Sequence, residues 1–324
     1  MPKREIRKIL VIKLSALGDV VLALAAMRRI REAHPGARIT LLTTPPFEAL
    51  ARLSPYVDEV DIDGRTEGFA EWWALVKRIR SARYDRIYDL QTSSRSSLIH
   101  LGLWPFPPQW SGIALGCSHP HRNPRRDFMH TLERQADQLK HAGIWPDAPT
   151  GPCQAPPPDV SWILNTGAKT GVVTHRPYVL MIPGGSAHRP EKRWPAERYG
   201  ELAQVLEARG YDTIVVGGTQ EAELANIIRR KAARALNLTG QTDLPRVAAL
   251  GARAALIVGN DTGPLHLAAA TGAPTIVLFS AASDPDLSAP RGHVVVLRSP
   301  DLAEMPVSQV LQAAEALVPM AQRA

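Results

Sequence analysis

The fold of this chain is decided around residues 259–266, which read Gly-Asn-Asp-Thr-Gly-Pro-Leu-His. The apolar run 254–258 before them predicts a buried strand, and the apolar residues after them predict a helix. Asp261 or Thr262 can cap that helix, and Pro264 suits its first turn. Free backbone N–H groups and the helix dipole meet at such a turn, a geometry that suits a phosphate group. An ordinary capped helix is the alternative interpretation, so the rest of the chain has to decide.

Apolar strands alternate with amphipathic helices on both sides of this segment. In the first half we predict strands at 9–13, 38–43, 57–62 and 86–90, and helices at 20–33, 47–53, 72–81 and 131–142. In the second half we predict strands at 178–182, 213–217, 235–238, 254–258, 274–279 and 294–297, and helices at 195–209, 221–235, 244–252 and 307–318. This alternation is typical of βαβ units, so we expect an α/β fold with doubly wound parallel sheets that bind ligands at the carboxyl ends of their strands.

A proline-rich stretch separates the two halves. Residues 145–158 contain six prolines and form the clearest linker in the sequence. We therefore predict two domains, 1–158 and 159–324, with a cleft between them. The proline- and histidine-rich region 105–126 is expected to be a loop. The final helix, 307–318, has the option of packing back on the first domain.

The composition is that of a globular protein with a basic surface. The 324 residues are 45% hydrophobic and 21% charged, and the net charge is +7. No stretch approaches the roughly 20 apolar residues of a membrane span, and no signal peptide precedes the first strand, so we expect a cytoplasmic protein. A basic surface attracts nucleic acid, anionic lipid or a phosphorylated substrate. No nucleic-acid-binding module is visible, so an anionic substrate or a membrane surface is the better interpretation.

The two cysteines, Cys117 and Cys153, do not make a disulfide framework. Residues 117–121 read Cys-Ser-His-Pro-His, which are metal-ligand types, but a second ligand pair at suitable spacing is missing. A flexible basic loop is the favoured interpretation there.

The loop that follows the first strand offers a carboxylate. Residues 13–19 read Lys-Leu-Ser-Ala-Leu-Gly-Asp, and Gly18 permits a tight backbone. Asp19 stands immediately before the predicted helix, where it can serve merely as an N-cap. The functional alternative is a carboxylate that removes a proton from a substrate hydroxyl.

The loop after the strand 178–182 offers glycines and cations. Residues 183–195 read Pro-Gly-Gly-Ser-Ala-His-Arg-Pro-Glu-Lys-Arg-Trp-Pro. A diphosphate needs such groups, because they combine close backbone approach with positive charge. The alternative is a solvated loop. We expect Trp194 to belong to the core, which would hold the nearby Lys192 in place.

Three common enzyme motifs are missing from the sequence. Residues 215–221 read Val-Val-Gly-Gly-Thr-Gln-Glu and end a predicted strand without a GxGxxG fingerprint, and no GxxxxGK[ST] loop occurs. These absences argue against a nicotinamide dehydrogenase and a P-loop NTPase. There is also no G-x-S-x-G elbow on which hydrolase chemistry could rest.

Taken together, these loops resemble the motifs of one family. The segments 15–19, 183–195 and 259–268 look like those of glycosyltransferase family 9, the heptosyltransferases of lipopolysaccharide core assembly. Residues 88–91, Tyr-Asp-Leu-Gln, and 238–240, Leu-Thr-Gly, also fit, in the expected order. The resemblance runs over nearly the whole chain. The order and spacing of the motifs together are specific, although each motif alone is weak.

The resemblance implies a GT-B fold, in which two Rossmann-like domains face a central cleft. The second domain would bind a nucleotide-sugar donor, typically ADP-heptose. The first domain would bind an anionic glycolipid acceptor, an inner-core Kdo or heptose, at the inner membrane surface. Transfer would invert the anomeric centre and would need no metal or cofactor. Such an enzyme would be cytoplasmic and peripheral on the cytoplasmic face of the inner membrane.

The resemblance also implies roles for particular residues. Asp19 matches the catalytic base, and Lys192 matches the lysine that neutralises the donor's phosphates. The predicted donor-binding residues are Gly184, Ser186, Lys192, Thr239, Asp261, Thr262, Gly263 and His266. The candidate acceptor-binding residues are Ser15, Gly18, Gln91, Arg95 and Arg122, with Arg125 and Arg126 as further candidates from the basic region.

Two segments depart from the family's pattern. Ser-Ala-Ala-Ser-Asp-Pro stands at 280–285, where members often have Gly-Pro-Thr-Asp-Pro, and Leu-Arg-Ser-Pro stands at 297–300, where a cysteine-bearing segment is common. These departures leave open a donor with another sugar for a different surface glycan, or a non-catalytic nucleotide-sugar-binding protein. The presence of both Asp19 and Lys192 favours an active heptosyltransferase.

Overall fold

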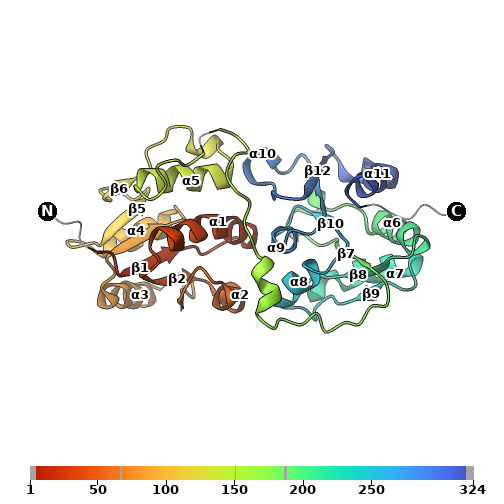
Figure 1. Ribbon diagram of the computed structural model, residues 1–324, viewed down its shortest axis with the longest axis horizontal. Helices are drawn as coiled ribbons and strands as arrows, with labels where there is room; N and C mark the ends of the chain where they lie inside the picture. Colours follow the sequence, from red (N-terminus) through yellow and green to blue (C-terminus); the bar gives the residue numbers. More distant parts are fainter. Residues whose placement is uncertain (1–4, 66–67, 150, 186–187, 319–324) are drawn as a thin grey trace. The chain divides into compact units, whose positions relative to one another are not determined.

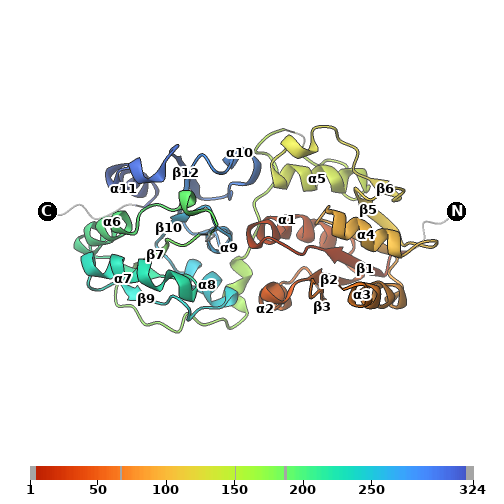
Figure 2. The same cartoon turned by 180° about the vertical axis from the view of Figure 1, so that it is seen from behind.

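The computed structural model describes residues 5–65, 68–149, 151–185 and 188–318, and Figures 1 and 2 show it from opposite sides. The chain divides into two compact units, Met1–Pro158 and Asp159–Ala324. Each unit contains one six-stranded sheet whose paired strands are all parallel. No helix in the described ranges is long and apolar enough to cross a membrane.

The first unit is a doubly wound α/β structure. Its strands are β1 (Lys8–Ile12), β2 (Arg38–Thr43), β3 (Glu59–Ile62), β4 (Arg86–Asp89), β5 (Gln109–Gly112) and β6 (His119–Pro120). Its helices are α1 (Leu17–Ala33), α2 (Glu48–Leu53), α3 (Phe69–Ala82), α4 (Ser94–Gly102) and α5 (Thr131–His141). The strands lie in the order β3-β2-β1-β4-β5-β6. This order places β1 and β4 side by side at the centre of the sheet.

The central strand β1 shows why the first sheet is covered on both sides. Four of its five residues are buried, as expected for a strand enclosed on both faces. Leu10 and Ile12 pack with side chains of α3 and α4. Since successive side chains of a strand point to opposite faces, the alternate residues Ile9 and Val11 face the other layer. Helices α1 and α5, which contact each other, provide that layer (Figure 1).

The second unit repeats the plan of the first. Its strands are β7 (Tyr178–Ile182), β8 (Asp212–Val215), β9 (Leu236–Asn237), β10 (Leu256–Asn260), β11 (Thr275–Phe279) and β12 (Val294–Arg298). Its helices are α6 (Ala196–Ala208), α7 (Ala222–Lys231), α8 (Leu244–Gly251), α9 (Gly263–Ala269), α10 (Pro285–Ser288) and α11 (Val307–Leu317). Short 3-10 helices occur in both units, at Pro45–Phe47 and Arg126–Phe128 in the first and at Ser161–Asn165, Pro190–Lys192, Thr219–Glu221 and Leu302–Glu304 in the second.

The second sheet has the strand order β12-β11-β10-β7-β8-β9, which is the order of the first sheet when its strands are counted from β7. One face packs against α6, α7 and α11, and the other against α8 and α9. In each unit the strand order reverses between two central strands, β1 and β4 or β7 and β10. Ligands of doubly wound sheets bind at the carboxyl ends of strands beside such a reversal.

The predicted fold class, α/β with two parallel sheets, is confirmed, but two predicted details are wrong. The region 105–126 is not all loop, because strands β5 and β6 lie in it. Helix α1 begins at Leu17, so Asp19 lies in its first turn and not before it. The final helix buries Val310 and Ala314 in the core of the second unit.

These differences have physical reasons. Strand β5 reads Gln-Trp-Ser-Gly and β6 contains a proline, so neither carries the apolar run by which strands are predicted. The serine-rich helix α4 was also not predicted, since its apolar periodicity spans only nine residues. Asp19 does not precede the helix but is the third residue of α1. From there its carboxylate accepts a hydrogen bond from the N–H of Ala16, the residue before α1.

Candidate functional site

A cavity of about 620 Å³ opens at the carboxyl ends of β7, β8 and β10. Two pairs of glycines line it, Gly184–Gly185 after β7 and Gly217–Gly218 after β8. Lys192, Asp261 and Thr262 line it as well, and apolar side chains of the same unit complete its wall. The two loops singled out from the sequence, 183–195 and 259–266, therefore meet in one hollow beside the reversal of strand order.

An ion pair joins these two loops. Lys192 Nζ lies 2.9 Å from Asp261 Oδ2, and both side chains are largely buried, with 16% and 10% exposed. Asp261 Oδ1 lies 3.2 Å from Nε2 of the buried His266. Burial by itself would raise the pKa of Asp261, but the hydrogen bonds and charges of His266 and Lys192 outweigh burial and hold that pKa below its ordinary value. The carboxylate thus keeps Lys192 in a fixed place at the cavity.

The start of α9 presents a threonine hydroxyl that forms no hydrogen bond with the described residues. Thr262 is the N-cap residue, yet its side chain makes no capping hydrogen bond. Its buried Oγ1 has no hydrogen-bond partner among the described residues. Gly263 and Pro264 also line the cavity, as does Arg189, whose Nη1 bonds to the carbonyl of Ala282 at 3.2 Å. A ligand that accepts hydrogen bonds would find donors here.

A buried amide that the sequence analysis did not select holds this site together. Asn260, at the end of β10, is fully buried. Its Oδ1 accepts hydrogen bonds from Trp194 N and Tyr199 Oη, both at 3.0 Å. Its Nδ2 donates to the carbonyls of Pro183 and Gly184 at 2.8 and 3.1 Å. A polar residue at the end of a buried strand was the available signal, since a buried amide must find partners.

Three glycines are required by close packing around the cavity. A Cβ on Gly184 would lie 2.9 Å from the Glu221 side chain, and one on Gly217 would lie 3.0 Å from it. Glu221 is buried, and its Oε2 accepts a 2.6 Å hydrogen bond from Gly218 N. A Cβ on Gly259 would lie 2.7 Å from the carbonyl of Ile182. The glycines therefore let neighbouring strands and loops approach at the place where a ligand would sit.

The remaining predicted donor-binding residues, Ser186, Thr239 and His266, are not among the described residues that line the cavity. Ser186 lies outside the described residues. Thr239 is buried and donates through Oγ1 to Asn237 Oδ1 at 2.7 Å, and it is not among the described residues that line the cavity. His266 is not among the described residues that line the cavity, and it bonds to Asp261, which is. Trp194 is 1% exposed, as predicted, and it belongs to the core.

The corresponding position of the first unit carries a carboxylate with cations around it. Asp19 Oδ2 accepts a hydrogen bond from Ala16 N at 3.3 Å, and the residue is half-buried. Burial lowers the pKa of Lys13, and the charge of Asp19 opposes that shift. Burial also lowers the pKa of Arg134 on α5, and Asp19 again opposes the shift. Lys13 and Arg134 were not selected from the sequence.

The loops after β1 and β4 are joined by an amide. Gln91 Oε1 accepts hydrogen bonds from Leu14 N and Ser15 N at 2.8 and 3.1 Å. The hydroxyl of Ser15 accepts a hydrogen bond from Arg65 at 2.9 Å. Gly18 lies in the first turn of α1. The structure thus brings the predicted residues Ser15, Gly18 and Gln91 together with Asp19.

The predicted acceptor arginines differ in their surroundings. Arg95 forms a two-point ion pair with the buried Asp63, at 2.6 and 2.7 Å. Arg126 donates to Thr92 Oγ1 at 3.1 Å and so lies at the loop after β4. Arg122 and Arg125 are exposed. Arg95 and Arg126 therefore flank the carboxyl end of the first sheet.

The basic segment that contains Cys117 is tied to α5. His121 Nε2 and Asn123 Nδ2 each lie 2.8 Å from Asp137 Oδ2. His141 completes a group whose possible metal-ligating atoms all lie within 4.8 Å of one another. Hydrogen bonds to Asp137 account for this group, and burial lowers the pKa of His121, which favours the neutral ring. Both cysteines are free, Cys117 buried and Cys153 exposed.

Two parallel six-stranded sheets, one with a lysine-lined cavity at its strand reversal, match the GT-B fold of solved heptosyltransferases. A family model for glycosyltransferase family 9 (heptosyltransferase) matches residues 72–313. The chain belongs to this family.

Named relatives agree with the family. The chain is 27% identical over 323 residues to lipopolysaccharide heptosyltransferase 2 of Escherichia coli K12, covering 88% of this chain and 86% of that protein. It is 25% identical over 296 residues to lipopolysaccharide core heptosyltransferase OpsX of Haemophilus influenzae, covering 85% and 79%. The structure of E. coli ADP-heptose lipopolysaccharide heptosyltransferase II matches with a TM-score of 0.80 at 27% identity, covering 96% of this chain and 98% of that one. E. coli heptosyltransferase WaaC with ADP shares the fold, with a TM-score of 0.76 at 22% identity over 96% of this chain and 100% of that one.

Proposed function

We propose that this glycosyltransferase moves a heptose from ADP-heptose to a lipopolysaccharide inner-core acceptor or a related surface glycan. Transfer inverts the anomeric centre and uses no metal. The observation that carries the proposal is the cavity at the end of β7 and β10, where Lys192 and the unpartnered Thr262 hydroxyl lie beside Gly184 and Gly185. The relatives are lipopolysaccharide heptosyltransferases, and one related structure is named for ADP-heptose, which supports this donor.

The second unit is the donor site in this proposal. The diphosphate lies against the glycine backbone, between the Lys192 ammonium and the Thr262 hydroxyl. The apolar side chains of Val216, Leu244 and Val247, which line the same cavity, provide a wall for a purine ring. As the bond from the anomeric carbon to the phosphate oxygen breaks, negative charge grows on the leaving ADP. Lys192 and Arg189 stabilise that charge, which is the role a metal ion would otherwise fill.

The first unit is the acceptor site, and Asp19 is the general base. The acceptor hydroxyl gives its proton to the Asp19 carboxylate while its oxygen attacks the anomeric carbon from the face opposite the leaving group. The cations Lys13 and Arg134 lie near Asp19, and Arg126 lies near Arg134. Together they attract the carboxylates and phosphates of an inner-core acceptor. We place the enzyme in the cytoplasm, peripheral on the inner membrane.

A donor panel tests this function. We expect ADP to raise the melting temperature more than UDP, GDP or CMP does, because ligands that bind the folded state stabilise it. With ADP-heptose and a heptose-deficient lipopolysaccharide acceptor, mass spectrometry should detect the added heptose. Stabilisation by another nucleotide in place of ADP would contradict the donor, and binding of ADP-heptose without any transfer would contradict the enzyme.

A further inference from the structure

Exposed apolar side chains concentrate on the first unit. Of the twelve large apolar side chains that are well exposed in the described part of the chain, eight belong to that unit. Five of them form what we call the α4 surface, and their exposed fractions are 52% for Leu98, 62% for Leu101, 53% for Trp104, 90% for Phe106 and 96% for Leu115. Apolar groups gathered in this way usually mark a surface that meets a partner or a membrane.

The residues of the α4 surface are neighbours in space. Leu98 and Leu101 are three residues apart on α4 and so share one side of the helix. Trp104 follows the helix, and its Cζ2 would lie 3.7 Å from a Cβ placed on Gly116, next to Leu115 in the chain. Arg80 donates to the carbonyls of Gly102 and Trp104 at 2.8 and 2.9 Å, which fixes the turn that presents the tryptophan.

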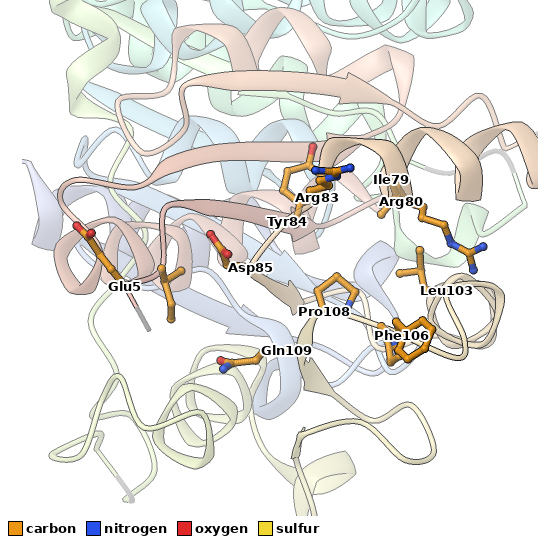
Figure 3. Close-up of a pocket in the computed structure, with 12 residues that line it drawn as sticks. Glu5, Ile79, Arg80, Arg83, Tyr84, Asp85, Leu103, Phe106, Pro108 and Gln109 are labelled. Carbon is orange, nitrogen blue, oxygen red and sulfur yellow. The ribbon is translucent and has the colours of Figure 1, made fainter. Parts of the chain in front are cut away.

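A pocket lined by two arginines and two acids adjoins the α4 surface (Figure 3). It has a volume of about 440 Å³, and Phe106, Arg80 and Arg83 line it. In Figure 3 Arg80, Leu103 and Phe106 lie together on one side of the pocket, away from Glu5. The two acids of the pocket already have partners. Asp85 Oδ2 accepts from Arg7 N and Lys8 N, and Glu5 pairs with Arg7 at 2.7 Å.

The cations beside this surface are available for an anion. Lys77 and Arg83 are exposed on α3 and at its end, and neither forms an ion pair with a carboxylate within the described ranges. Lys77 lies over the Trp73 ring, 5.9 Å from its centre. A surface that combines exposed tryptophan, phenylalanine and leucine with arginine and lysine is typical of proteins that bind the interface of an anionic bilayer.

We propose that the α4 surface docks this enzyme on an anionic phospholipid bilayer. The inference rests on the proposed function in one respect, which is that the acceptor is lipid-anchored. Trp104, Phe106 and Leu115 enter the boundary between headgroups and acyl chains, while Arg80 and Arg83 contact lipid phosphates. Helix α4 carries both ends of the arrangement. Its first turn holds Arg95, near Gln91 and the Asp19 loop, and its exposed side holds Leu98 and Leu101. A docked α4 lies along the bilayer, with Arg95 at the carboxyl end of the first sheet and Trp104 and Phe106 at its amino end.

Vesicle binding by the full chain tests the docking surface. We expect the wild-type protein to sediment with vesicles of phosphatidylglycerol and phosphatidylethanolamine, and to release as salt is raised. The triple variant Trp104→Ser, Phe106→Ser, Leu115→Ser should bind about tenfold or more weakly, and Arg83→Glu severalfold more weakly. The matched control is Leu164→Ser, Leu236→Ser, Val296→Ser, which removes exposed apolar side chains of the second unit and should bind like wild type.

Three results would overturn the docking surface. The first is that the wild type does not bind vesicles, and the second is that the triple serine variant of the α4 surface binds them as well as the wild type does. The third is that the wild type is a dimer which this variant converts to a monomer, because the surface would then bind a second copy of the chain. Melting temperatures confirm that the variants remain folded. Transfer to a water-soluble, delipidated acceptor separates the two proposals. The α4-surface variant should keep the activity on this soluble acceptor. If the wild type lacked that activity, the proposed function would be contradicted, and the vesicle-binding results alone would decide the docking surface.

Discussion

The two units share one strand order but fill the same position with opposite chemistry. At the reversal between β7 and β10, the second unit places the Lys192–Asp261 ion pair, a free threonine hydroxyl and four glycines around a cavity. At the reversal between β1 and β4, the first unit places the half-buried carboxylate of Asp19 among cations. One arrangement suits a bound anion and the other suits proton removal from an anionic molecule.

The comparison shows how a repeated fold can divide the work of a transferase. In both units an amide fixes the loops, Asn260 in the second and Gln91 in the first. The second unit's amide has four partners and is fully buried, whereas the first unit's amide has two and is half-buried. The second unit is therefore the more tightly constructed of the two, which agrees with the proposal that it holds the donor's charge in place without a metal.

Removal of the first unit's carboxylate should have the largest effect. We expect Asp19→Asn to lower the transfer rate by about 10²- to 10⁴-fold, because a positioned general base contributes that much. ADP binding, measured by calorimetry, should stay within about twofold of wild type. The matched control is Asp147→Asn, an exposed aspartate of the same unit. Full activity of Asp19→Asn would remove Asp19 from the role of base.

Removal of the second unit's cation should act on binding. We expect Lys192→Ala to weaken ADP binding by about 10- to 100-fold, as loss of a charged hydrogen bond costs about 1.5–3 kcal/mol. Lys231→Ala is the matched control, since that lysine pairs with Glu201 at 2.8 Å on the surface of the same unit. If ADP bound both variants equally well, Lys192 would not belong to the phosphate site.

The two amides should differ in their contribution to stability. Asn260→Ala removes four hydrogen bonds from a dry site and should lower the free energy of unfolding by about 3 kcal/mol. Gln91→Ala removes two at a half-buried site and should cost about 1 to 2 kcal/mol. Urea denaturation measures both. A larger loss for Gln91→Ala would reverse the proposed order of rigidity.

The buried aspartates of the two units should respond to pH in opposite directions. Burial raises the pKa of Asp89, at the end of β4, to about 6, whereas Lys192 and His266 hold that of Asp261 below its ordinary value. Asp89 therefore contributes stability that is complete below pH ~4 and is lost as the pH rises through about 6. Asp261 contributes stability above pH ~4 that is lost as the pH falls.

This contrast predicts the smallest of the effects. We expect Asp89→Asn to reduce the loss of unfolding free energy between pH 5 and pH 7 by about 1 to 2 kcal/mol relative to wild type. Urea denaturation at the two pH values measures the change, and Asp147→Asn serves as the exposed control. Equal pH dependence in Asp89→Asn and wild type would contradict the raised pKa.

Much of the fold and part of the site could be predicted from the sequence. The apolar runs predicted the central strands, and β2 and β7 have the predicted bounds, because buried parallel strands are continuously apolar. Strands β5 and β6 could not be predicted in this way, since sheet pairing and not composition holds them in place. The loops of Lys192 and Asp261 were selected from their glycines and charges.

Contacts that depend on tertiary structure could not be predicted. Lys192 and Asp261 are 69 positions apart, and only the neighbouring of β7 and β10 brings them together. The charge of Asp19 acts on Arg134 because α5 packs on α1, and nothing in the local sequence of α5 indicates that packing. The four partners of Asn260 likewise lie far from it in the chain, in the loop 183–195 and in α6.

The central claim is that the second unit, and not the first, seats the donor's diphosphate. A crystal structure of the enzyme with ADP tests it most directly. We predict that the β-phosphate lies within hydrogen-bond distance of Lys192 Nζ and Thr262 Oγ1, against the backbone of Gly184 and Gly185. A diphosphate bound instead by Lys13 and Arg134 of the first unit would contradict the account.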